Sequence, residues 1–221
     1  MGTRGTGPGH RPATACLLAP SARERLVAAM AATCAEHGYR AASVEDVLAR
    51  TGLPRQAFDE HFADKAECAI AALDELLSET TQAVSRAQAP EFADWRRLLL
   101  ATRALLELLA AQPSAARLAL IEARTAMPAE AYDRYAAGIR VLVALLDRVR
   151  TYADGGAPAS ATRGAIGGAE LLIRRELLAG REDRLPELLP DIIYGTVVPF
   201  LPQQEALRYA ALARELLSDG G

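Results

Sequence analysis

Apolar residues recur every three or four positions along most of the chain, which predicts amphipathic helices. One such stripe consists of Leu26, Met30, Cys34 and His37. A second consists of Ala69, Ala72, Leu73, Leu76 and Leu77. No stretch alternates apolar and polar residues as a half-buried strand does, and no segment repeats. The pattern therefore predicts an all-α fold.

Local signals mark where the first helices begin. Three segments place a Ser or Asp three positions before an acidic residue: Ser21 to Glu24, Ser43 to Asp46, and Asp64 to Glu67. In such a capping box the first side chain accepts a hydrogen bond from a free helix amide, while the second accepts one from the cap residue's own amide. We therefore expect helices to begin near residues 21, 43 and 64.

Glycine and proline predict where these helices end and resume. Gly38 is expected to end the first helix as a left-handed cap, and Gly52 to provide the positive φ of a tight turn. Pro54 suits the first turn of a short helix that extends to Phe62, with Phe58 and Phe62 facing inward. Helices this short are unstable alone and must pack together. Two short helices joined by a glycine-containing turn form a helix-turn-helix unit.

Six further helices are predicted, near residues 92–111, 114–126, 128–152, 160–180, 186–200 and 203–218, with prolines at or near their starts. Residues 1–20 are rich in Gly, Pro, Thr and Arg and predict a disordered arm. The expected organisation is thus an arm (1–20), a helix-turn-helix domain (21–66) and a larger helical domain (67–221).

Composition agrees with a helical, well-packed protein, because 51% of the 221 residues are hydrophobic and only 5% are aromatic. The net charge of −3 argues against a generally basic nucleic-acid binder. Residues 1–58, however, carry seven Arg against four acidic residues, a local charge of +3. This asymmetry fits a protein that contacts phosphate at one end, although random scatter also produces so small a difference.

Other features restrict the class of protein. Cys16, Cys34 and Cys68 lack metal-type spacing, which indicates free thiols in a reducing cytoplasm, and we expect no metal or cofactor. No apolar run approaches the roughly 18 residues of a membrane helix. The chain has no HExxH, GxSxG, P-loop or CxxC motif, and all three His lie at or before residue 61, so an enzyme is disfavoured.

One run of residues resembles the TetR family of bacterial transcription regulators. It comprises Gly38, Tyr39, Ser43, Val44, Asp46, Val47, Ala49, Gly52, Leu53, Phe58, His61, Phe62 and Lys65. The tail also resembles part of that family, at residues 188–194, 199–201 and 205–206. The resemblance implies about nine or ten helices. It also implies a homodimer, binding to a double-stranded DNA operator, and release of that DNA by a small-molecule effector. Residues 21–66 would then be the DNA-binding domain, and residues 67–221 the regulatory and dimerisation domain.

In such a regulator the helix from Pro54 to Phe62 lies in the major groove. Arg55 and Gln56 stand at its start, where Arg reads guanine and Gln reads adenine. Ser43 and Lys65 are expected to bind phosphate, and His61 either donates to phosphate or is merely packed or exposed. Arg4 and Arg11 either enter the minor groove or belong to a plain tail.

Asp59 departs from the family, which usually has a Tyr at this position that touches the DNA backbone. A carboxylate there either repels phosphate or accepts a hydrogen bond from cytosine N4. Pro54 and Ala57 replace hydroxyl residues that are common in the family. We therefore expect weaker DNA binding or an unusual operator, and the alternative is a TetR-like ligand- or protein-binding module that has lost specific DNA binding.

The expected body offers two further sets of candidates. Those for an effector pocket, each also explained by surface or core packing, are Trp95, Arg103, Glu122, Tyr132, Tyr135, Glu170 and Arg174. The family's dimer is a four-helix bundle made by the helices near 160–180 and 186–200. Candidates for that interface are Gly164, Gly167, Gly168, Leu171, Ile193 and Val197. Close packing within one subunit also explains the glycines.

Overall fold

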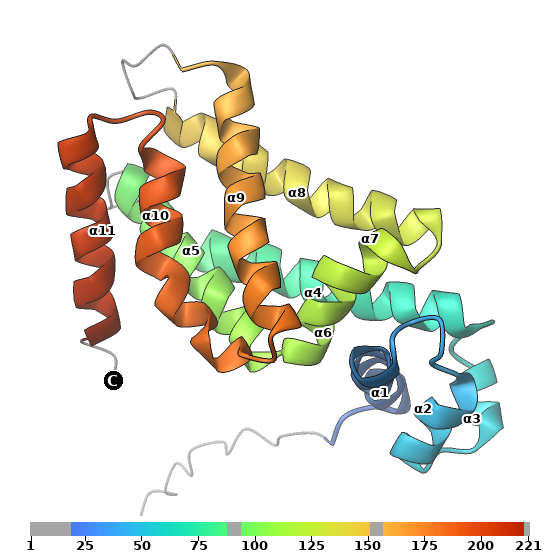
Figure 1. The fold of residues 1–221 in the computed structure, drawn as a ribbon. Coiled ribbons are helices and arrows are strands. Elements are labelled where there is room, and N and C mark those ends of the chain that lie inside the picture. The colour runs from blue at the N-terminus through green and yellow to red at the C-terminus, as the bar shows by residue number, and fades with distance from the viewer. Residues whose placement is uncertain (1–18, 88–93, 151–156, 219–221) are drawn as a thin grey trace, which may run out of the picture.

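Every regular element in the described residues is a helix, which confirms the all-α prediction (Figure 1). The computed structural model describes residues 19–87, 94–150 and 157–218. Arg4, Arg11, Cys16 and most of the expected arm lie outside these ranges.

Three short helices form the head: α1 (Ala22–His37), α2 (Val44–Thr51) and α3 (Arg55–Asp59). The capping boxes predicted at Ser21 and Ser43 are both present. At the third, the Glu67 amide donates to Asp64 Oδ1 at 2.9 Å, but the Glu67 carboxylate accepts from the amide of Ala63 at 2.6 Å instead of that of Asp64. The local signals therefore start all three helices within about one residue of the predicted positions.

The two glycine turns differ from each other. Gly52 has φ 67° and ψ 16°, the left-handed conformation that was predicted. Gly38 has φ 78° but ψ 151°, so it is not a left-handed cap and the chain leaves α1 in an extended direction. The expected stripe on α1 is also one residue too long: Leu26, Met30 and Cys34 are buried, whereas His37 is exposed because it ends the helix beyond the core.

The body consists of the remaining elements: α4 (Lys65–Ala87), α5 (Asp94–Ala111), α6 (Pro113–Arg117), η1 (Leu118–Glu122), α7 (Ala123–Thr125), α8 (Ala129–Arg150), α9 (Ala159–Leu178), η2 (Glu182–Leu188), α10 (Leu189–Val197) and α11 (Gln203–Ser218). The helix predicted at 114–126 contains one π-helical turn, η1. The helix predicted at 186–200 begins as the 3₁₀ helix η2 and ends at Val197.

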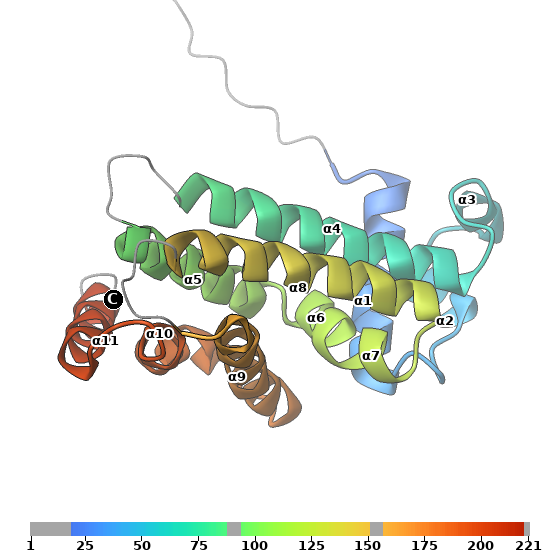
Figure 2. The same ribbon diagram turned by 90° about the horizontal axis from the view of Figure 1, so that it is seen from above.

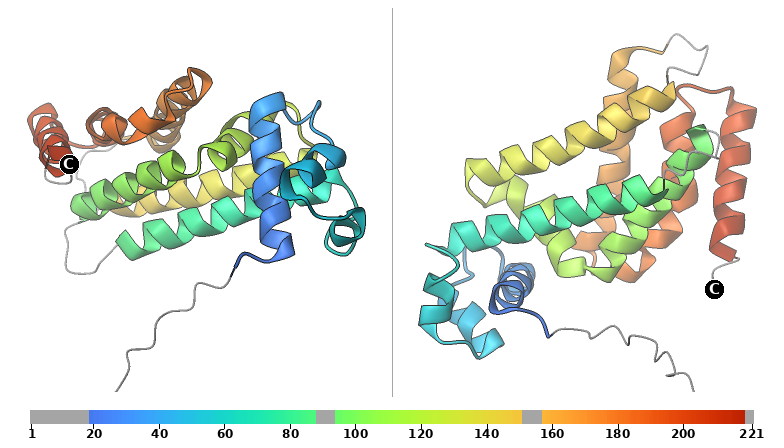
Figure 3. Two further views of the ribbon diagram at one scale, coloured as in Figure 1. Left: turned by 90° about the horizontal axis from the view of Figure 1, so that it is seen from below. Right: turned by 180° about the vertical axis from the view of Figure 1, so that it is seen from behind.

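The long helix α4 joins the two parts, running from the head along the body beside α8 (Figure 2). Helices α9, α10 and α11 form a second layer over α5 and α8, away from the head (Figure 3). The head has its own apolar core, which extends into the body through Ala69 and Ala72 of α4 and Leu118 of η1. Movement of α4 or η1 therefore displaces residues of the head core directly, because packed interiors transmit displacement.

Cys34 and Cys68 are free thiols buried in the head core, and burial raises the pKa of each to about 12. In the part of the chain that the structure describes, no group of three or more His, Cys, Asp or Glu side chains is placed to hold a metal ion. Within the same ranges, no single helix is long and apolar enough to cross a membrane; α5 and residues 113–125 pass that test only as a pair bent by 105°.

Candidate nucleic-acid interface and effector cavity

Helix α3 presents one face to solvent and buries the other. Pro54, Arg55 and Gln56 are exposed, while Phe58 is fully buried and its ring centre lies 5.6 Å from that of Phe62. Five residues cannot form a stable helix alone, so this aromatic anchor holds α3 in place. Pro54 is the N-cap of α3 rather than its first residue.

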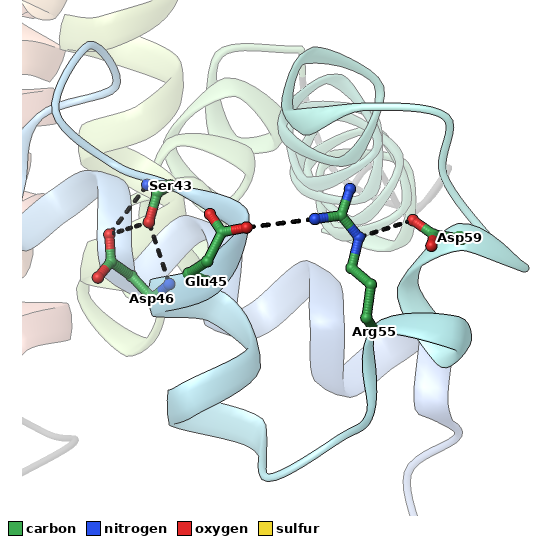
Figure 4. Close-up of polar contacts among 5 residues, drawn as sticks. All are labelled: Ser43, Glu45, Asp46, Arg55 and Asp59. Atoms are coloured by element: carbon green, nitrogen blue, oxygen red, sulfur yellow. Dashed lines mark hydrogen bonds and ion pairs between the residues drawn. The ribbon is translucent and has the colours of Figure 1, made fainter.

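Two carboxylates hold the guanidinium of Arg55 (Figure 4). Its Nε donates to Asp59 Oδ1 at 2.9 Å, one turn further along α3, and its Nη1 lies 3.2 Å from Glu45 Oε1 on α2. These contacts, Asp59 first, raise the pKa of Arg55 above its ordinary value. The arginine that is predicted to read bases thus stands between two negative charges, and Asp59 is paired rather than free.

Gln56 is held in a similar way, since its Nε2 donates to Glu60 Oε1 at 2.9 Å. His61 is exposed just beyond α3, with its ring centre 6.3 Å from that of Phe62. Residues 21–66 carry six basic and seven acidic side chains, a net charge of −1. The local charge of +3 predicted from the sequence was counted over residues 1–58. That range includes Arg4 and Arg11 of the arm and ends before Asp59 and Glu60.

Ser43 caps α2: its Oγ accepts from the Asp46 amide at 3.1 Å and donates to Asp46 Oδ2 at 2.5 Å. The bond from the Ser43 hydroxyl to the carboxylate, and then a bond from the Ser43 amide to the same oxygen, lower the pKa of Asp46. The hydroxyl proton is therefore already engaged, and a phosphate contact from it requires release of the Asp46 carboxylate.

Lys65 turns back onto the loop between α1 and α2. Its Nζ donates to the carbonyl oxygens of Tyr39 at 3.0 Å and Ala42 at 2.9 Å, lies 3.5 Å from that of Arg40, and sits 4.5 Å from the centre of the Tyr39 ring. An ammonium has three donors, so this loop occupies all of them. Its contact with phosphate remains a prediction, and that contact requires Nζ to leave at least one carbonyl.

The sequence of this head matches a known family. Residues 26–72 match the family model described as bacterial regulatory proteins, tetR family. This match identifies the head as a TetR-family DNA-binding domain. The chain is accordingly a DNA-binding transcription regulator built on a helix-turn-helix domain.

Solved structures share the TetR-family fold over most of the chain. The fatty acid degradation regulator FadR from Bacillus halodurans aligns with a TM-score of 0.69 and 16% identity, covering 79% of this chain and 96% of that one. A gamma-butyrolactone receptor described as ArpA-like gives 0.70 and 18%, covering 90% and 97%. TylP, a TetR regulator from Streptomyces fradiae, gives 0.65 and 22%, covering 90% and 96%. No curated protein sequence matches significantly.

The body contains a cavity of about 200 Å³. Its wall comes mainly from aliphatic side chains of α4, α5, α8 and α9, with Ala119 and Leu120 of the π turn. Two of the seven predicted effector residues, Tyr135 and Glu170, line it.

A polar cluster forms at Tyr135 and Glu170. Glu170 is paired with Arg124 of α7 and, at 3.8 Å, with Arg174 of its own helix, another predicted effector residue. Arg124 also lies over the Tyr135 ring, 5.6 Å from its centre. The sequence does not predict this role of Arg124, because Arg124 lies in a segment without a motif and its partner Glu170 is 46 residues away.

The other four predicted effector residues do not line the cavity. Trp95 stacks on Phe200 with ring centres 6.3 Å apart. Arg103 joins α5 to α11 through the Leu216 carbonyl at 3.3 Å. Tyr132 is exposed. Glu122, at the end of the π turn, accepts a hydrogen bond from the Tyr39 amide at 2.9 Å, so it connects the body to the head.

The predicted dimer residues fall into two groups. Gly164, Gly167 and Gly168 have open space where a side chain would stand, and together with Leu171 they form one exposed face of α9. Packing within one subunit therefore does not explain the glycines. Ile193 and Val197 are each 1% exposed. Their assignment to the interface is wrong, because α10 turns these side chains into the core of its own subunit.

Proposed function

We propose that this TetR-family chain is a ligand-responsive transcription repressor that binds a pseudo-palindromic operator as a homodimer in the cytoplasm. The observation that carries the proposal is the outward pair Arg55 and Gln56 at the start of α3, directly after the left-handed turn at Gly52. These residue types read guanine and adenine edges in the major groove.

Control by a small molecule is supported by the apolar cavity and by its link to the head. The same π turn supplies Ala119 and Leu120 to the cavity wall and Glu122 to the Tyr39 amide. A molecule that changes this turn therefore biases the loop that leads into α2. The neighbour SmeT is described as the repressor of a multidrug efflux pump, which is consistent with repression here.

A second function, binding of ligand or protein without specific DNA recognition, is favoured by one observation. The base-reading Arg55 is neutralised by Glu45 and Asp59 in a head whose net charge is −1. Such a surface attracts a duplex weakly, since most nonspecific affinity comes from phosphate neutralisation.

Selection from a random-sequence duplex library with the purified full-length protein separates these functions. For the repressor we expect an enriched palindrome whose half-sites are about one helical turn, roughly 34 Å, apart. The variant Arg55→Ala should lose that enrichment, and Arg184→Ala, which removes an equally exposed body arginine, should keep it. No enrichment with the wild-type protein would support the second function instead.

A further inference from the structure

Two of the hydroxyl groups in the cavity wall already have partners. The hydroxyls of Thr81 and Thr102 each donate at 2.8 Å to carbonyl oxygens of their own helices, those of Leu77 and Leu98. Such bonds use the single hydroxyl proton. These parts of α4 and α5 therefore offer a ligand mainly apolar surface.

Among the described residues of the wall, Tyr135 is the one with a buried side-chain polar atom that no neighbour bonds in good alignment. It lines the cavity, is only 6% exposed, and has the Glu170 carboxylate and the Arg124 guanidinium close to its hydroxyl. Burial and then Glu170 raise the pKa of Tyr135 above its ordinary value, whereas Arg124 lowers it, so the hydroxyl keeps its proton at neutral pH and can donate. Glu170 is already paired with two arginines, so a well-placed acceptor on a bound molecule would give this buried hydroxyl a better partner.

The charges beside Tyr135 restrict what that molecule is. Glu170 is matched by two guanidiniums, those of Arg124 and Arg174, so the cluster carries an excess of one positive charge. Arg174 Nε is also buried without a hydrogen-bond partner, and it too is a donor. A cationic head group would meet like charge here, whereas an uncharged or anionic acceptor would not.

We propose that the effector is a compact, largely apolar molecule, not a cation, that places one oxygen acceptor against the hydroxyl of Tyr135. This rests on the proposed function, since it assigns the effector of the same cavity. The size follows from the volume of about 200 Å³, since an apolar protein cavity of about 150 Å³ is large enough for benzene. The acceptor is a carbonyl or a carboxylate oxygen.

Four probes of similar shape test the proposal by calorimetric titration of the full-length protein: acetophenone, benzoate, cumene and 1-phenylethylammonium. We expect acetophenone or benzoate to bind about five- to tenfold more tightly than cumene or the ammonium, the gain of one hydrogen bond. Acetophenone and benzoate distinguish an uncharged acceptor from an anionic one.

The variant Tyr135→Phe should abolish that preference and leave the affinity for cumene unchanged. The control Tyr132→Phe changes a tyrosine three positions earlier on α8 that is 51% exposed and does not line the cavity, and it should bind as the wild type does. Thermal unfolding of both variants checks that they are folded. The proposal is overturned if cumene binds as tightly as acetophenone and benzoate, if Tyr135→Phe keeps the preference, or if none of the probes binds.

The DNA assay separates this proposal from the proposed function. A protein that enriches an operator but shows no acceptor preference retains the repressor assignment and loses the effector class. A protein that prefers acetophenone through Tyr135 but enriches no DNA retains the effector class and loses the repressor assignment.

Discussion

At the scale of single residues, the side chains proposed to face DNA are already bonded to neighbours. Arg55 has ion pairs with Asp59 and Glu45, and Gln56 is bonded to Glu60. Ion pairs between exposed side chains contribute little, whereas a bidentate contact with guanine discriminates by roughly five- to a hundredfold. DNA that offers guanine can therefore displace these partners, and DNA that does not leaves Arg55 neutralised. The carboxylates thus reduce binding to nonspecific DNA more than binding to an operator.

The variant Asp59→Asn tests this directly. It removes one negative charge expected to face the phosphates and leaves only a neutral acceptor for Arg55 Nε, so we expect affinity for a random-sequence duplex to rise about three- to tenfold at low salt. Fluorescence anisotropy at several salt concentrations measures the change. The matched control is Glu107→Gln in the body: its carboxylate is also paired with an arginine one turn away and is 52% exposed, against 53% for Asp59. An affinity that falls on random and selected duplexes alike would contradict the repulsion, and a fall on the selected operator alone would show that Asp59 reads a cytosine.

At the scale of elements, the loop between α1 and α2 is held from two sides. Lys65, at the start of α4, binds its carbonyls, and Glu122, at the end of the π turn, binds the Tyr39 amide. The loop continues directly into Ser43, which caps α2. The body therefore contacts the head at the loop whose end, Ser43, determines where α2 begins.

Replacing Glu122 measures how much that contact contributes. In Glu122→Ala the Tyr39 amide loses its acceptor, and we expect about fivefold faster hydrogen exchange in residues 38–46, the effect of one typical hydrogen bond. Glu122→Gln keeps an acceptor oxygen and should retain most of the protection. Glu130→Ala, which removes an exposed carboxylate at the start of α8, serves as the control. Equal protection in all three variants would show that the loop is held without Glu122.

The distance along the chain between interacting residues decides how far the sequence predicts this fold. Helix starts are predictable because capping boxes and proline positions act over three or four residues, as at Ser21 and Ser43. The contacts of Lys65 and Arg124 are not predictable in this way. The partners of Lys65 lie 23 to 26 residues away in the chain, and the partner of Arg124 lies 46 residues away. The periodicity of Ile193 and Val197 indicates an apolar face, but periodicity does not tell whether that face packs in its own subunit or against another copy. For the same reason the sequence predicts only Tyr135 and Glu170 of the cavity wall, which draws on five helices and the π turn.

At the scale of the whole molecule, no other described helix covers one face of the second layer. Along α9 the exposed positions include Gly164, Gly167, Gly168, Leu171 and Leu178, which recur at helical spacing. Leu171 and Leu178 are 66% and 60% exposed, unusually high for side chains of this size in one row. Glycines beside them leave the α9 backbone open to close approach by another helix. These features support the expected homodimer through α9, which would place two heads on one duplex.

A charge at the centre of this row should separate the subunits. We expect Leu171→Arg to convert the dimer to a monomer at micromolar concentration, because two guanidiniums would be buried against each other across a symmetric contact. Analytical ultracentrifugation measures the change, and binding to a palindrome should fall far more than binding to a single half-site, since only the dimer gains from two linked contacts. Leu207→Arg, on the exposed face of α11 and 50% exposed, is the matched control and should remain dimeric. If Leu207→Arg dissociates the protein and Leu171→Arg does not, the subunits meet through α11 rather than α9, and the spacing of the two heads must be derived from that contact instead.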